Sequence, residues 1–192
     1  VLHLHQGSPQ QVADMLLRGE ADIGLATETL AEVAELVALP CYRWTHRVIV
    51  PAGHSLSAAG PLTLKALAAH PLITYEAGYT VRRHIEEAFA RAGLQPQVIL
   101  TAMDADVIKT YVELGLGVGI VAAIAVDEAR DTGLTALEAG HLFPANLTRL
   151  AVRRGALLRA YAYRFIETFA PPLTRAVVER AVQSDPGTSF DI

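Results

Sequence analysis

The chain has 192 residues, 52% of them hydrophobic, and a formal net charge of −4 at pH 7. Its length and composition allow one domain or two small lobes, and the negative charge with scattered arginines argues against a nucleic-acid-binding surface. The single cysteine, Cys41, excludes an intrachain disulfide, and no apolar run reaches the roughly 20 residues that span a bilayer.

The first 27 residues predict a strand, a helix and a second strand. Apolar residues alternate with histidine over 1–6, which favours a strand. A helix is predicted to begin after Ser8, with Ser8 as N-cap, Pro9 at the first position and Gln11 closing a capping box. The segment 22–27 is the next predicted strand.

The middle of the chain predicts further extended segments and helices. Extended segments are expected at 36–40 and 42–51, a short helix at 62–70 and a strand at 71–76. A helix capped by Thr80 and ended by Gly93 should follow, with three apolar side chains inward: Val81, Ile85 and Phe89.

The stretch from 96 to 126 predicts a βαβ crossover. A short strand at 98–100 precedes Asp104, a good helix N-cap. Glycines after 114 end the helix, and the nearly apolar run 118–126 is typical of a strand covered on both faces. The predicted inward side chains of this helix are Val107, Ile108, Tyr111, Val112 and Leu114, with Lys109 and Glu113 turned away.

The rest of the chain predicts an edge strand at 134–137, a strand at 147–153 and a helix at 158–169. That helix should point Leu158, Tyr161, Phe165 and Phe169 inward. A last helix at 174–182 and a frayed tail from 184 follow. Repeated strand–helix units joined by short loops predict an α/β fold, with helices on both faces of mostly parallel sheets.

Binding features are expected where helices begin after strands. The helix starts at Ser8, Thr80 and Asp104 each offer free backbone N–H groups and the positive end of a helix dipole. Asp104 repels anions, whereas the hydroxyls of Ser8 and Thr80 suit an anion or a polar ligand. Thr27 ends its strand where ligands bind in open α/β sheets. Plain capping or turn chemistry is the alternative reading at each position.

No catalytic group, cofactor site or metal site emerges from the sequence. His3 and His5 share a predicted strand face but lack the further ligands that a metal needs. Cys41 has no plausible base beside it, which favours an inert thiol. Asp104 and Asp106 are too close together to serve as an acid and a base on opposite sides of a substrate.

Several stretches resemble one family. The matching segments are HQGSPQQ at 5–11, ADIGLATE at 21–28, LPCYRW at 39–44, TAMDADVIKTYVELGLGVGIVA at 101–122 and RRGALLRAYAYRFIETFAP at 153–171. All are similar to the CysB group of LysR-type transcriptional regulators. The resemblance implies an effector-binding domain of two Rossmann-like lobes, like a type 2 periplasmic binding protein. Lobe I would comprise 1–42 and 146–170, lobe II 45–143, and a C-terminal helix and tail 171–192.

The resemblance also implies the ligand and its site. In this family sulfate or an acetylated serine binds in the interlobe cleft, and the regulators control sulfur assimilation and cysteine biosynthesis. Thr27 and Thr80 match two of the family's ligand hydroxyls, and Gly78 and Tyr79 belong to the adjoining ligand loop. Trp44 matches a crossover tryptophan associated with the inducer response. A departure from the family loop is Glu76, which brings a carboxylate near the expected anion site.

The implied partners are a small-molecule effector and further copies of the chain, as a dimer, or a tetramer when full length. DNA would be bound only through a winged helix-turn-helix domain that this chain lacks, in a cytoplasmic protein without membrane contact. The family's earlier strand inside the lobe I sheet is also absent, so we expect an incomplete lobe I. A free-standing solute-binding protein is the alternative, and a doubly wound enzyme ranks third.

Overall fold

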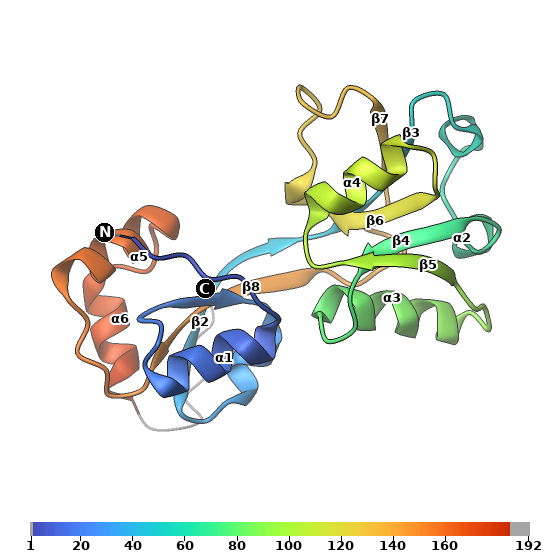
Figure 1. Ribbon diagram of the computed structural model, residues 1–192. Helices are drawn as coiled ribbons and strands as arrows, with labels where there is room; N and C mark the ends of the chain where they lie inside the picture. The colour runs from blue at the N-terminus through green and yellow to red at the C-terminus, as the bar shows by residue number, and fades with distance from the viewer. Residues whose placement is uncertain (1, 185–192) are drawn as a thin grey trace. The chain divides into compact units, whose positions relative to one another are not determined.

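The computed structural model describes residues 2–184 and divides the chain into two compact units (Figure 1). Unit 1 combines Val1–Arg43 with Leu147–Ile192, and unit 2 is the continuous segment Trp44–Asn146. Each unit has a mixed β-sheet with helices packed on it, as the predicted α/β class requires.

The sheet of unit 1 has three strands in the order β1 (Gly24–Ala26), β8 (Asn146–Arg153), β2 (Leu36–Trp44). Its two faces bury different helices, because successive side chains of a strand point to opposite faces. Leu150 and Val152 pack with α5 (Ala160–Phe169) and α6 (Arg175–Val182), whereas Ala151 packs with α1 (Pro9–Arg18).

The start of α1 confirms the predicted capping box. The Ser8 hydroxyl accepts the Gln11 N–H at 3.3 Å, and the Gln11 side chain accepts the Ser8 N–H at 2.8 Å. Gly19 ends the helix with φ +72°, a conformation that costs glycine little.

Two expectations for unit 1 are wrong. Residues 2–6 form no strand, and Leu2 and Leu4 are largely exposed. Helix α5 buries Ala162 and Ile166, while Tyr161 and Phe165, expected inward, are exposed. The helix is apolar on more than one face, so spacing alone did not identify the packed one. The tail expected from 184 lies, apart from Ser184, outside the described residues.

The sheet of unit 2 has five strands in the order β5 (Gln97–Ala102), β4 (Pro71–Tyr75), β6 (Val118–Ala122), β3 (His46–Pro51), β7 (Leu134–Glu138). Strand β4 is parallel to both β5 and β6, and β3 is antiparallel to both β6 and β7. The expected mostly parallel arrangement is therefore wrong, because the antiparallel pairings of β3 make the sheet mixed. The predicted edge position of β7 is confirmed.

Three α-helices accompany this sheet within the described part of the chain: α2 (Leu64–Ala68), α3 (Thr80–Arg91) and α4 (Ala105–Glu113). Figure 1 shows α3 and α4 on opposite faces of the sheet. The inward residues predicted for α3 are buried, whereas α4 buries only Ile108 and Val112 on a narrower stripe. Val107, Tyr111 and Leu114, predicted inward, are exposed. Short 3₁₀ turns lie at Glu28–Glu32, Ser55–Ala58 and Ala123–Ala125, the last of which ends the predicted strand 118–126 early.

Candidate functional site

The candidate site of unit 2 lies at the carboxyl edge of its parallel strands. Strands β4, β5 and β6 end at Tyr75, Ala102 and Ala122, and the chain crosses to a helix or turn after each of them. The Tyr75 hydroxyl accepts the Ala122 N–H at 3.3 Å, and the Glu76 N–H donates to the Ala102 carbonyl at 3.2 Å. These bonds hold the strand ends together at the edge where open α/β sheets bind ligands.

The loop after β4 presents the N-terminus of α3. Glu76 and Gly78 are exposed, and Gly78 turns the chain with φ +94°. Tyr79, rather than the predicted Thr80, is the N-cap, because the extended backbone ends at Tyr79; its side chain makes no capping hydrogen bond within the described residues. Thr80 is the first helical residue and is only 4% exposed. With no acidic residue in its first turn, α3 offers a favourable end for an anion.

Tyr75 precedes this loop, and Glu76 and Tyr79 belong to it. The Tyr75 and Tyr79 ring centroids are 6.1 Å apart. Partial burial raises the pKa of the Tyr79 hydroxyl, and the Glu76 carboxylate raises it further. Tyr79 therefore stays an uncharged hydrogen-bonding group at neutral pH, and the Glu76 charge acts from an exposed position.

The remaining predicted site residues occupy distinct places. Thr27 follows β1 in unit 1 and is the N-cap of the 3₁₀ turn Glu28–Glu32; the Glu28 carboxylate accepts the Leu147 N–H at 2.7 Å. Thr80 belongs to unit 2. Trp44 ends β2 and opens unit 2, with its ring centroid 5.7 Å from that of His46.

Sequence reasoning missed a buried polar pair in unit 2, His46 and Asn146. His46 and Asn146 are fully buried, and the Asn146 amide nitrogen lies 3.2 Å from His46 Nε2. Burial, and then the charge of His84, lower the pKa of His46 to about 4. His46 and Asn146 are 100 residues apart in the sequence, so no local spacing could have revealed the pair.

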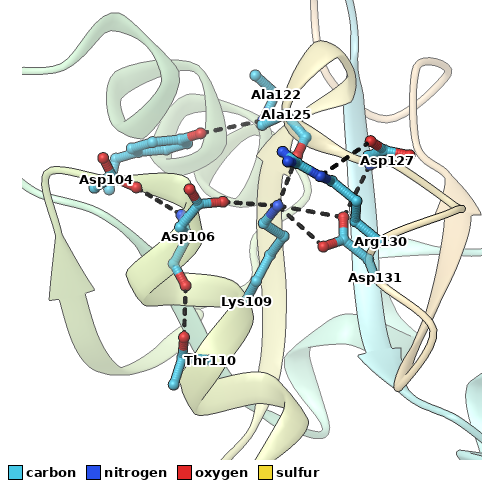
Figure 2. Close-up of polar contacts among 10 residues, drawn as sticks. Asp104, Asp106, Lys109, Thr110, Ala122, Ala125, Asp127, Arg130 and Asp131 are labelled. Atoms are coloured by element: carbon cyan, nitrogen blue, oxygen red, sulfur yellow. Dashed lines mark hydrogen bonds and ion pairs between the residues drawn. The ribbon is translucent and has the colours of Figure 1, made fainter.

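Beside this edge, Lys109 anchors the turn after β6 (Figure 2). Its ammonium donates to the Ala125 carbonyl at 3.0 Å and lies 2.7 Å from Asp106 and 3.1 Å from Asp131. Partial burial raises the pKa of Asp131, but the Asp127 N–H and Lys109 outweigh it and hold that pKa below its usual value.

Asp104 and Asp106 have local structural roles in the same region. Asp104 accepts the Asp106 N–H at 2.7 Å, which confirms the predicted cap, and Asp106 pairs with Lys109. This network explains why α4 begins where it does, and it presents no acid–base pair.

The other candidates remain without chemical support. Burial raises the pKa of the Cys41 thiol, which leaves it protonated at neutral pH. Residues 2–184 contain no group of three or more His, Cys, Asp or Glu side chains that could hold a metal ion. In the same residues, no helix is both long and apolar enough to cross a membrane.

Comparison with known proteins gives one consistent family. The LysR substrate binding domain matches residues 1–171. The regulators SsuR and CysB of Burkholderia cenocepacia are 57% and 50% identical to the chain, over 92% and 96% of its length. The chain spans 58% and 59% of those two proteins, so it corresponds to rather more than half of each.

Solved structures support the same fold. The cofactor-binding domain of the Cbl transcriptional regulator superposes with a TM-score of 0.87 at 46% identity, covering 94% of this chain and 80% of that one. The effector-binding domain of QuiR, solved with shikimate, has a TM-score of 0.76 at 15% identity over 88% of this chain and 80% of that chain. At that identity the second likeness shows the fold alone.

Proposed function

Because the chain belongs to the LysR substrate binding domain family, we propose that it is the effector-sensing domain of a transcriptional regulator of sulfur metabolism. The similar proteins SsuR, CysB and Cbl are all named as transcriptional regulators, and the match is to a binding domain rather than to an enzyme. The effector is sulfate or an acetylserine-like small anion, and the controlled pathway is sulfur assimilation leading to cysteine.

The proposal rests on the position of Thr80 at the start of α3. Its hydroxyl is buried in the first turn of α3, and that turn contains no acidic residue. The helix dipole favours an anion there, and a loop with a glycine at its tip leaves room for the ligand to approach. Gly78 and Tyr79 contribute the loop backbone and an uncharged hydroxyl.

Effector binding acts by a population shift. An effector that binds one conformation of the domain more tightly raises the population of that conformation, and the shift is no larger than the difference in affinity. The shift is passed to a DNA-binding domain outside this chain. Trp44, at the start of unit 2, reports the change and takes part in transmitting it.

Removing the Thr80 hydroxyl is expected to weaken effector binding. A hydrogen bond to a charged group contributes about 1.5–3 kcal/mol, so Thr80→Ala should raise the dissociation constant about tenfold or more. Thr80→Ser retains the hydroxyl and should bind within about threefold of the parent, which is the scatter of a modest packing change. Titration calorimetry with sodium sulfate and with N-acetyl-L-serine provides the measurement.

Glu76→Gln serves as the control variant, because it changes a side chain of the adjoining loop without removing the Thr80 hydroxyl. The carboxylate is exposed and screened by salt, so its removal should tighten anion binding only slightly at physiological ionic strength. If Thr80→Ala binds both ligands as tightly as the parent does, the anion does not bind at the N-terminus of α3. A large gain in Glu76→Gln that grows at low salt would instead place that carboxylate beside the anion.

A further inference from the structure

Arg82 occupies a position in α3 that helix stability alone does not favour. It lies in the first turn, where the positive end of the helix dipole repels a cation. Its ion pair with Glu86, four residues later, places the cation before the carboxylate, which is the less stabilising order for such a pair. Glu87 and Arg91 in the same helix have the opposite, favourable order. The placement of Arg82 therefore indicates a contact outside the helix.

The guanidinium of Arg82 makes that contact at the end of β4. Its Nη1 donates to the Tyr75 carbonyl at 3.4 Å, while its Nε donates to the Glu86 carboxylate at 2.7 Å. Helical side chains lean toward the N-terminus of their helix, which directs this one back over the preceding loop. The side chain is only 17% exposed. Two nitrogens of one planar group thus join two acceptors.

This contact connects the two ends of residues 76–79, which we call the ligand loop. The loop leaves the sheet at Tyr75, and Thr80 begins α3 directly after it. Arg82, in the helical turn that follows the loop, bonds to the residue that precedes the loop. Bringing the ends of a loop together costs conformational entropy. Because that cost is met before a ligand arrives, less entropy is lost on binding.

We propose that Arg82 is a positioning residue of the effector site, which holds the ligand loop in the conformation that presents its backbone and Thr80 to the anion. The inference rests on the proposed function and deepens it. The shape of the guanidinium is essential, because one nitrogen reaches Tyr75 across the loop while another is held by Glu86. A positive charge without that fork does not close the loop.

Titration calorimetry with sodium sulfate and with N-acetyl-L-serine, on the protein as its gene encodes it, measures the contribution of Arg82. Arg82→Lys keeps the charge but replaces the fork with a single ammonium, so it should raise the dissociation constants about fivefold or more. Arg83→Gln is the matched control, because it removes the same charge from the neighbouring, exposed position. It should bind both ligands within about twofold of the parent, since salt screens an exposed charge.

Hydrogen exchange observed by NMR distinguishes positioning of the loop from a general loss of stability. The Tyr79 N–H donates to the Glu76 carbonyl at 3.4 Å inside the ligand loop. In ligand-free Arg82→Lys this amide should exchange about threefold or more faster than in the parent. The amide of Ile85, a buried residue in the middle of α3, should exchange at the parental rate.

Glu86→Ala is a second variant that decides the matter if Arg82→Lys does not fold, because Glu86 is exposed and its removal frees one side of the guanidinium. It should weaken binding and speed Tyr79 exchange by about twofold or more. Parental binding in Arg82→Lys or in Glu86→Ala overturns the inference alone, as does an equal loss in Arg83→Gln or an unchanged Tyr79 exchange rate. If the parent binds neither ligand, the proposed function fails and the inference fails with it.

Discussion

Replacing Phe89 with alanine is expected to destabilise unit 2 by about 3–5 kcal/mol. The Phe89 ring is fully buried in the core between α3 and the sheet, so its removal loses apolar burial and leaves a cavity that the packed neighbours fill only in part. This loss is a large fraction of the roughly 5–15 kcal/mol that stabilises a typical domain.

Urea unfolding followed by tryptophan fluorescence measures the effect, because Trp44 is the single tryptophan and belongs to unit 2. Tyr111→Ala is the matched control, an aromatic truncation on α4 at a side chain that is 37% exposed. It should cost about 1 kcal/mol or less, as surface substitutions do. Equal losses in the two variants would contradict the assigned core.

Acidification from pH 7 to pH 4 is expected to destabilise unit 2 through His46. Burial lowers the pKa of His46 in the folded chain to about 4, below the 6.5 of an ordinary histidine. Between pH 6.5 and pH 4 the unfolded chain binds a proton at His46, whereas the folded chain keeps this histidine neutral. The free energy of unfolding therefore decreases as the pH falls through this range and levels off below about pH 4. The loss by pH 4 is about 3 kcal/mol from this group alone.

His46→Gln isolates that contribution, since glutamine keeps a polar side chain near Asn146 and does not titrate. The difference in unfolding free energy between parent and variant, measured at several pH values by Trp44 fluorescence, should change by about 3 kcal/mol in favour of the variant between pH 7 and pH 4. A difference that stays constant with pH would show that His46 is protonated as readily in the folded unit as in the unfolded chain.

Local signals predicted local structure well. The capping box at Ser8 and the cap at Asp104 depend on side chains and N–H groups within three residues of each other, and both formed as expected. The residues 2–6 alternate like a strand, but a strand also needs a partner for its backbone groups, and these residues have none in the sheet of unit 1.

The site depends on contacts that local patterns cannot encode. Thr80 was predicted to matter, yet its burial follows from how α3 packs on the sheet rather than from its neighbours in sequence. His46 and Asn146 are 100 residues apart, and their pairing depends on the strand order. The exposed Tyr161 and Phe165 make the same point for packing, because an apolar face is buried only where another element covers it.

The chain's division into a continuous and a discontinuous unit has a consequence for the order of folding. Unit 2 is complete in the growing chain once Asn146 has been synthesised and has left the ribosome, whereas unit 1 must wait for its second half, which begins at Leu147. Joining the halves of unit 1 across an unfolded loop of about 100 residues would cost about 4 kcal/mol in chain entropy. Folded unit 2 removes most of that cost in advance, because it holds His46 and Asn146, near its two ends, within hydrogen-bonding distance. Damage to unit 2 should therefore slow the assembly of unit 1 during biosynthesis, while damage to unit 1 should leave the folding of unit 2 unaffected.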